Sequence, residues 1–447
     1  MIPSADRAAA PETQEWPLQA QEPPDLVRLQ ASNPQRYPGL LLSSGETGWD
    51  ILFAFPQDVV ALMRRDGLSA LAAHPAMRLR PRDPDSDLPF SGGWLCAFAY
   101  ELGGLFEPSV AIPGDAADFP FAWIARVPAA ILVDRSRQRV VLVAEAGRDD
   151  LLDALEQDLK ATHPAPADLI GVPAIEEDDP ADFLSGVERI QAYIRAGDVF
   201  QVNLSRGWRA EFSHPVPPAS LFNRLMRRNP APFSALVQTD DWAIVSSSPE
   251  RLVRLHGDGM LETRPIAGTH PRSDNPAEDA ALRARLESHP KERAEHVMLV
   301  DLERNDLGRV CEPGSVRVEA LMDVASYAHV HHIESTVRGK LRNEATVFDV
   351  LRAVFPGGTI TGCPKVRTMQ IIRELERTPR RAYTGSLGYI NLDGRFDLNI
   401  LIRSFLLRGS TLTFRAGAGI VADSIPQREL DETRAKARGL LRALERA

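Results

Sequence analysis

Two pairs of glutamates with the same spacing are the residues best placed to do chemistry. Glu292 and Glu295 lie three residues apart in a strongly helical segment, and Glu429 and Glu432 repeat that spacing near the C-terminus. Each pair projects from one face of its helix, which by itself is typical of a solvated helix surface. If the two helices face each other, up to four carboxylates converge, and such a cluster needs a cation or a shared proton. Mg²⁺ is the expected cation, because it prefers oxygen ligands and needs only one or two protein carboxylates.

Groups that favour anions occur near these carboxylates in the sequence. Arg403 interrupts the apolar run Leu398–Leu407, where it is either an edge residue or a clamp for a carboxylate. Lys436 lies one turn beyond Glu432, and Gly417-Ala418-Gly419 follows strand-like residues and could offer backbone N–H groups to an oxyanion. The residues by themselves therefore predict a magnesium-dependent enzyme for a small polycarboxylate.

Three other patterns resemble known sites but do not fit them. Gly417–Ala422 matches a dinucleotide-binding fingerprint, yet too few residues follow it for a complete βαβ unit. Gly358–Lys365 resembles a phosphate-binding loop, but Pro364 supplies no N–H and no Ser or Thr follows the lysine. His331 and His332 fall on opposite faces of a predicted strand, which favours one functional histidine over a zinc site.

The elements that position these residues are predicted from apolar patterns. Residues 1–25 are expected to form a flexible lead-in, and residues 26–162 an N-terminal region of short strands, among them Gly93–Tyr100 and Phe121–Val133. Residues 163–182 carry four prolines and an acidic run, which indicate a linker before a catalytic region over 183–447. Several strands follow one another without a crossover helix, so an antiparallel α+β fold is predicted. The predicted helices of the catalytic region are Phe183–Arg195, Ala277–Arg304, Val347–Val354, Lys365–Glu376 and Gln427–Leu444, and one of its predicted strands is Phe396–Leu407.

Composition narrows the class of protein. The 447 residues carry a net charge of −9, which argues against a nucleic-acid-binding surface and favours small-molecule chemistry. The three cysteines are far apart and form neither a disulfide framework nor a metal-ligand pair, so a reducing, cytoplasmic setting is expected. No apolar run approaches the length of a membrane span, and no signal peptide is evident at the N-terminus.

Taken together, several longer motifs resemble the chorismate-utilising enzyme family, and most closely its aminodeoxychorismate synthases. The similarity runs from Phe183 to the end of the chain, with weaker similarity upstream. The resemblance implies an α+β fold in which antiparallel sheets pack as a β-sandwich core with flanking helices. The motifs are Asp198–Ser205 (DVFQVNLS), Ser248–Arg251 (SPER), Arg264–Thr269 (RPIAGT), Glu292–Gly308 (ERAEHVMLVDLERNDLG), Phe355–Arg367 (FPGGTITGCPKVR), Gly417–Ser424 (GAGIVADS), Leu41–Ser44 (LLSS) and Gly92–Glu107 (GGWLCAFAYELGGLFE).

The resemblance also implies a role for individual residues. Glu295 and Glu432 match direct Mg²⁺ ligands, while Glu292 and Glu429 match carboxylates that hold metal-bound waters. The remaining matches surround the substrate chorismate: Tyr383, Arg403 and the backbone of Gly417, Ala418 and Gly419 at the enolpyruvyl carboxylate, Lys436 as an added positive charge, His332 beside the departing hydroxyl, and Thr359 and Gly268 lining the pocket.

Two positions bear on the nucleophile and the product. By the resemblance, Gln201 occupies the position of a lysine general base in family members that add water to chorismate. Glutamine cannot deprotonate water at neutral pH. The resemblance therefore implies ammonia as nucleophile, supplied by a separate glutamine amidotransferase subunit. Ala267 replaces a lysine that attacks the ring in many aminodeoxychorismate synthases, and anthranilate synthases also carry alanine there.

The product therefore remains open at this stage between aminodeoxychorismate, which we favour, and anthranilate. Leu41–Ser44 reads Leu-Leu-Ser-Ser where tryptophan-regulated anthranilate synthases carry Leu-Leu-Glu-Ser, which weakens the case for tryptophan control. A non-catalytic, chorismate-binding paralogue is a third hypothesis, and the intact glutamates, His332 and Arg403 argue against it.

Overall fold

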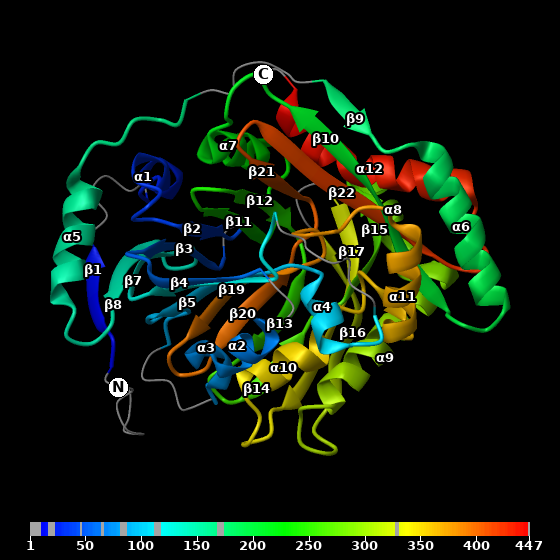
Figure 1. Cartoon of the computed structure of the whole chain (residues 1–447), viewed down its shortest axis with the longest axis horizontal. Helices are drawn as coiled ribbons and strands as arrows, with labels where there is room; N and C mark the ends of the chain where they lie inside the picture. Colours follow the sequence, from blue (N-terminus) through cyan, green and yellow to red (C-terminus); the bar gives the residue numbers. More distant parts are fainter. Residues whose placement is uncertain are drawn as a thin grey trace.

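Two antiparallel sheets organise the protein (Figure 1). The structure is a computed structural model that describes residues 10–16, 23–44, 47–63, 67–80, 87–110, 118–167, 174–326 and 330–445. In the described residues the larger sheet runs, in spatial order, through β1 (Glu12–Trp16), β8 (Arg139–Ala144), β7 (Ala129–Asp134), β3 (Trp49–Ala54), β2 (Gly39–Leu42), β11 (Phe233–Gln238), β12 (Ala243–Ser248), β21 (Ser404–Arg408), β22 (Thr411–Ile420), β10 (Gln201–Glu211) and β18 (Gly362–Cys363), with β9 (Ile175–Glu177) paired to β10.

The second sheet lies against the first and is joined by helices on its outer side. Its strands run through β15 (Ile266–Pro271), β17 (Val330–Lys340), β14 (Met260–Thr263), β13 (Arg251–Leu255), β20 (Phe396–Ile400), β19 (Ser386–Asn391), β5 (Gly93–Phe98), β6 (Ala122–Val127) and β4 (Gln57–Leu62), with β16 (Arg317–Ser326) paired to β17. The helices are α1 (Leu26–Ser32), α2 (Gly67–Ala73), α3 (Pro75–Arg78), α4 (Leu102–Phe106), α5 (Asp149–Lys160), α6 (Pro180–Arg195), α7 (Pro218–Arg228), α8 (Pro276–Ser288), α9 (Pro290–Gly308), α10 (Val347–Val354), α11 (Lys365–Leu375) and α12 (Pro426–Leu444).

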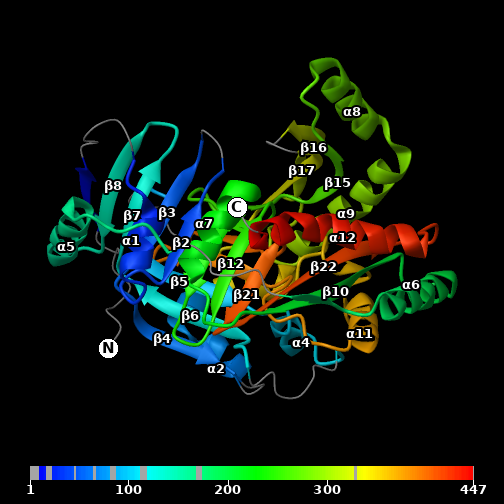
Figure 2. The same cartoon turned by 90° about the horizontal axis from the view of Figure 1, so that it is seen from above.

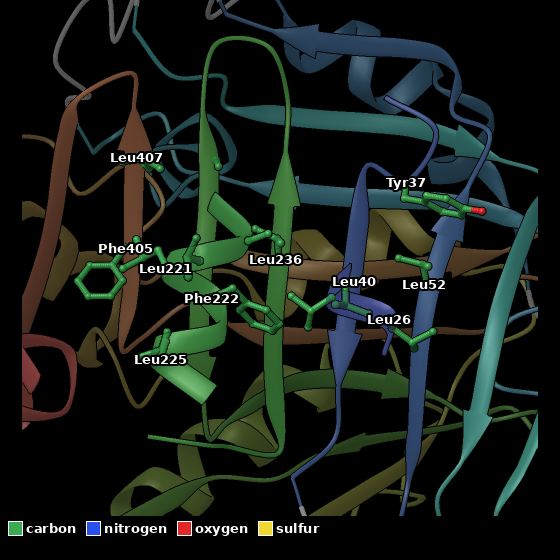
Figure 3. Close-up of a cluster of buried hydrophobic side chains, with 14 of the residues drawn as sticks. Leu26, Tyr37, Leu40, Leu52, Leu221, Phe222, Leu225, Leu236, Phe405 and Leu407 are labelled. Atoms are coloured by element: carbon green, nitrogen blue, oxygen red, sulfur yellow. The ribbon is translucent and has the colours of Figure 1, made fainter. Parts of the chain in front are cut away.

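Side chains alternate between the two faces of each strand, so each sheet contributes to apolar clusters on both of its faces. In β3, Ile51 and Phe53 join an apolar cluster with residues of both sheets, whereas Leu52 points the opposite way. Leu52 instead joins a cluster that includes residues of α1, α5, α7 and α12. Figure 3 shows Leu221, Phe222 and Leu225 of α7 packed over β11 and β12. A third cluster packs α2, α3, α4, α9 and α10 on the second sheet. The predicted α+β fold with a sandwich of antiparallel sheets is confirmed.

The N-terminal and catalytic regions predicted from the sequence share both sheets. In the larger sheet β2 pairs with β11, and in the second sheet β5 pairs with β19. Within the predicted lead-in of residues 1–25, Glu12–Trp16 forms β1 against β8, so this part is a strand rather than a flexible segment. Within the predicted linker 163–182, Ile175–Glu177 forms β9 on β10. The rest of the lead-in before residue 10 and between 17 and 22, and residues 168–173 of the linker, lie outside the described residues.

Three predicted elements are each split in two. The predicted helix Ala277–Arg304 is two helices, because Pro290 has no N–H to continue α8 and instead opens α9, with His289 as N-cap. The predicted strand Phe121–Val133 breaks at Pro128, so that β6 and β7 enter different sheets. The strand expected over 396–407 breaks between β20 and β21, where Arg403 takes a left-handed φ of 50°.

The two helices that carry the glutamates pack on different sheets. Helix α12 packs against β22, and α9 packs against β15 and β17. Figure 2 shows α8 and α9 at the same end of the molecule as α12, away from the N-terminal strands. Within the described residues, no helix combines the length and apolar character needed to cross a bilayer.

Candidate active site

The glutamates of α9 and α12 form an electrostatically coupled group. Burial raises the pKa of Glu295, and the neighbouring Glu292 and Glu432 act in the same direction. Gln201 at the start of β10 opposes this effect by donating from Nε2 to Oε1 of Glu295 over 2.6 Å. All four glutamates lie in the first two turns of their helices, where the helix dipole also favours negative charge.

This convergence is only partly the cluster that the sequence predicts. Glu429 is buried, whereas Glu432 is half exposed and forms an ion pair of 2.7 Å with Lys436. In the part of the chain that the structure describes, no three His, Cys, Asp or Glu side chains have the arrangement of a metal site. The carboxylates of Glu292, Glu295 and Glu432 are therefore close enough to interact, but they do not form a closed ligand set.

Lys436 connects the glutamates to the glycine-rich strand. Its Nζ donates to the carbonyl oxygen of Gly417 over 3.0 Å, while the same group pairs with Glu432. The predicted proximity of Lys436 to the glutamates is thus present in the structure.

The glycines of β22 leave room that any side chain would fill. A Cβ at Gly419 would clash with the amide of Gln201 and lie 3.2 Å from Glu295 Oε1. A Cβ at Gly417 would lie 2.9 Å from the hydroxyl oxygen of Tyr383. Ala418, between them, is buried in a core cluster with β10 and α6, so only its backbone can face the site. The two glycines therefore bring the glutamate group and Tyr383 together along one strand.

A second group of site residues surrounds Arg403. Burial lowers the pKa of His332 to about 4, and the charge of Arg403 acts in the same direction. Nδ1 of His332 lies 3.2 Å from the carbonyl oxygen of Gly268, so in the neutral ring Nδ1–H donates to that oxygen and Nε2 accepts. Gly268 has a φ of 66°, and a Cβ there would lie 3.0 Å from Glu292 Oε2. Gly268 thus joins the two groups.

The structure adds Glu250, a residue that the sequence reasoning did not assign. Glu250 follows β12 and is almost fully buried, and burial raises its pKa to about 7. The Thr359 hydroxyl, the Ile266 N–H and the Arg403 charge oppose this shift. A buried carboxyl that titrates near neutrality beside an arginine is a candidate proton donor. The Ser-Pro-Glu motif was visible in the sequence, but its burial was not.

The chain is similar to known enzymes over most of its length. The family of chorismate binding enzymes matches residues 38–442. The chain is 40% identical to aminodeoxychorismate synthase component 1 of Salmonella typhimurium over 381 residues, which cover 85% of this chain and 81% of that protein. It is 39% identical to anthranilate synthase component 1 of Streptomyces coelicolor over 406 residues, which cover 86% and 78%.

A solved structure shows the same likeness. Anthranilate synthase component I of Streptococcus pneumoniae matches with a TM-score of 0.78 and 32% identity over 90% of this chain and 93% of that one. The chain therefore belongs to the chorismate binding enzyme family and is a chorismate-utilising enzyme. The resemblance noted from the motifs is confirmed. The relatives differ in product at similar identity, so the comparisons do not resolve the specific reaction.

Substitution of Gly419 by alanine tests the space between Gln201 and Glu295. We expect Gly419→Ala to lower kcat/KM for chorismate by about a hundredfold, because the added Cβ displaces both side chains from their hydrogen bond. The measurement is the steady-state consumption of chorismate with ammonium salt and Mg²⁺. Gly308→Ala is the matched control, since a Cβ at that position would meet no atom within 4 Å. Equal activity of the two variants would contradict the assignment of Gly419 to the site.

Proposed function

We propose that the protein aminates chorismate to 4-amino-4-deoxychorismate, the precursor of para-aminobenzoate, with ammonia from a separate glutamine amidotransferase subunit. The environment of Gln201 is the observation that supports ammonia rather than water as the nucleophile. Its Nε2 is held by Glu295, and its buried Oε1 has no hydrogen-bond partner among the residues described. A carboxamide in this setting cannot act as a base toward water, but its free oxygen can accept an N–H from ammonia.

The glutamate group fits a magnesium ion. Half-buried Glu295 is destabilised as an anion by burial and by two neighbouring carboxylates, and a divalent cation would relieve that repulsion. Glu295 and Glu432 would bind the ion directly, and Glu292 and Glu429 would act through metal-bound waters. When bound, magnesium would neutralise the ring carboxylate of chorismate.

The enolpyruvyl carboxylate of chorismate would bind to hydrogen-bond donors near Arg403 and β22. Tyr383, Arg403 and the backbone N–H groups of Gly417 and Gly419 would hold the enolpyruvyl carboxylate, because they supply hydrogen-bond donors in a buried place. Lys436 adds a positive charge to this strand through its contact with Gly417.

Proton transfer is assigned to Glu250 rather than to His332. His332 is neutral near pH 7 and its Nδ1–H is committed to Gly268, so the ring can orient the departing hydroxyl but does not protonate it. Protonated Glu250 would give its proton to that hydroxyl, which leaves as water. The carboxylate would then take a proton from the newly added ammonium group, so that the proton balance closes.

Anthranilate synthesis is the second candidate, and Ala267 is the residue that favours it. Ala267 is buried opposite Ile333 and supplies no nucleophile, so a covalent lysine route does not exist in this chain. In our proposal ammonia attacks the ring directly. Anthranilate would instead require loss of the enolpyruvyl group as pyruvate. A non-catalytic paralogue is disfavoured because Glu250, the cations Arg403 and Lys436 and the four glutamates are all present.

Mass spectrometry of the products separates these functions. Purified protein would be incubated with chorismate, Mg²⁺ and an ammonium salt at mildly alkaline pH, which replaces the amidotransferase. We expect an amino-substituted chorismate that retains its enolpyruvyl group. Anthranilate with released pyruvate would overturn the proposal in favour of the second candidate, and unchanged chorismate would support the non-catalytic paralogue.

The metal assignment predicts the behaviour of Glu295→Ala. This variant should lose Mg²⁺-dependent turnover by at least about a hundredfold, because a direct ligand is removed, while the thermal unfolding temperature changes little. Asp301→Asn is the matched control, since Asp301 lies on the same helix and is exposed. The readout is turnover against Mg²⁺ concentration. Full activity of Glu295→Ala would refute the metal site.

The raised pKa of Glu250 predicts a pH dependence. The proton donor is present below its pKa and lost above it, so kcat/KM for chorismate should fall as pH rises through about 7. The assay would hold the concentration of unprotonated ammonia constant at each pH. Glu250→Gln should lower kcat by about a hundredfold or more and remove this alkaline decline. A decline that persists in Glu250→Gln would show that another group donates the proton.

A further inference from the structure

A buried carboxylate of the N-terminal region contacts the segment that carries Tyr383. Glu101 lies between β5 and α4 and is 6% exposed. Its Oε1 accepts from the backbone N–H of Arg380 over 2.7 Å, and both its oxygens accept from the N–H of Arg381, at 3.2 and 3.0 Å. In return, the N–H of Tyr100 donates to the carbonyl oxygen of Arg381 over 2.9 Å. Two adjacent residues therefore hold Arg381 at both its N–H and its carbonyl group.

The segment held in this way has an unfavourable backbone conformation. Arg381 has a φ of 53° and Thr384 a φ of 60°, values that residues with a side chain rarely adopt. Tyr383 lies between them and is buried. Such conformations persist only where surrounding contacts enforce them, and they occur preferentially at functional sites. The hydrogen bonds from Glu101 are contacts of this kind.

The position of this segment determines the position of the Tyr383 hydroxyl. The Arg380 guanidinium donates to the carbonyl oxygens of Asn203 at 2.7 Å and Ile360 at 3.0 Å, and it lies 5.6 Å from the centre of the Tyr383 ring. The Tyr383 hydroxyl in turn faces Gly417, where an added Cβ would be 2.9 Å away. Glu101 is therefore connected to the site through a short chain of backbone and side-chain contacts, without being part of the site.

We propose that Glu101 is a positioning residue that acts through Tyr383. By accepting the N–H groups of Arg380 and Arg381 it holds the left-handed turn, and the turn holds the tyrosine hydroxyl toward the carboxylate of the substrate. The inference rests on the proposed role of Tyr383 in binding chorismate. It makes the N-terminal region a necessary part of the substrate site.

The test compares Glu101→Gln with Asp118→Asn. The glutamine keeps the size of the side chain but removes its charge, and it replaces the oxygen that accepts from the Arg381 N–H at 3.0 Å by an N–H₂ group, which cannot accept. The control removes charge from Asp118, which binds the guanidinium of Arg381 at 3.1 Å and does not contact its backbone. We expect Glu101→Gln to raise KM for chorismate about tenfold with a change in kcat of less than about threefold, because ground-state positioning is lost. Asp118→Asn should stay within about twofold of the wild type.

A double variant shows whether the effect passes through Tyr383. If it does, Glu101→Gln combined with Tyr383→Phe should be little worse than Tyr383→Phe alone, because the second change removes the group that the first misplaces. Additive losses, or an unchanged KM in Glu101→Gln, would overturn the proposal. A lowered unfolding temperature with an unchanged KM would also overturn it, since that result shows a purely structural role.

A further variant covers the case in which Glu101→Gln does not fold. Glu101→Asp keeps the buried charge but shortens the side chain by one methylene, which draws the carboxylate away from the N–H groups of Arg380 and Arg381. It should raise KM for chorismate in the same way, and an unchanged KM would refute the proposal. All these readouts follow chorismate, whichever product forms. A product other than aminodeoxychorismate would therefore overturn the proposed function and leave this comparison valid.

Discussion

Repulsion between carboxylates is the constraint on which the site depends. Glu292 and Glu432 raise the pKa of Glu295, whose charged form burial already disfavours. The chain compensates with the amide of Gln201, with Lys436 and with the N-terminal ends of α9 and α12. These groups reduce the repulsion without removing it, and the remainder favours a divalent cation. In the proposed function, the same group of side chains would bind the metal and, through the metal, a dianionic substrate.

The two sheets of the sandwich hold these charged groups in fixed positions. Strand β10 pairs with β22 from Val202 to Glu211, with Asn203 opposite Gly419. The side chains of Gln201 and Asn203 lie where a Cβ at Gly419 or Gly417 would be. The glycines are needed because side chains on β22 would occupy the space used by Gln201 and Tyr383. The second sheet supplies His332 and Gly268 from β17 and β15. The site therefore lies where the ends of the two sheets meet, and neither sheet supplies it alone.

Burial shifts the pKa values of Glu250 and His332 in opposite directions. It raises the pKa of Glu250 to about 7 and lowers the pKa of His332 to about 4, because in each case the charged form is disfavoured. Near neutral pH the carboxyl of Glu250 is therefore partly protonated, and the imidazole of His332 is neutral. Arg403, between them, favours the anionic carboxylate and the neutral ring. In the proposed function, this difference makes Glu250 the proton donor and His332 a hydrogen-bond acceptor.

The sequence by itself determined the family, the two glutamate pairs and the antiparallel α+β class, because spacing and short motifs are local properties. It also showed that Gln201 and Ala267 exclude a lysine base and a lysine nucleophile, since residue type alone decides that chemistry. The predicted helix and strand ran through Pro290 and Arg403, where the structure ends one element and begins the next. Only the tertiary structure decided that Glu250 is buried and that Lys436 reaches Gly417. It alone showed that Glu101 holds Arg381, 280 residues away. Burial and proximity across such separations depend on how whole sheets pack, and no local pattern encodes them.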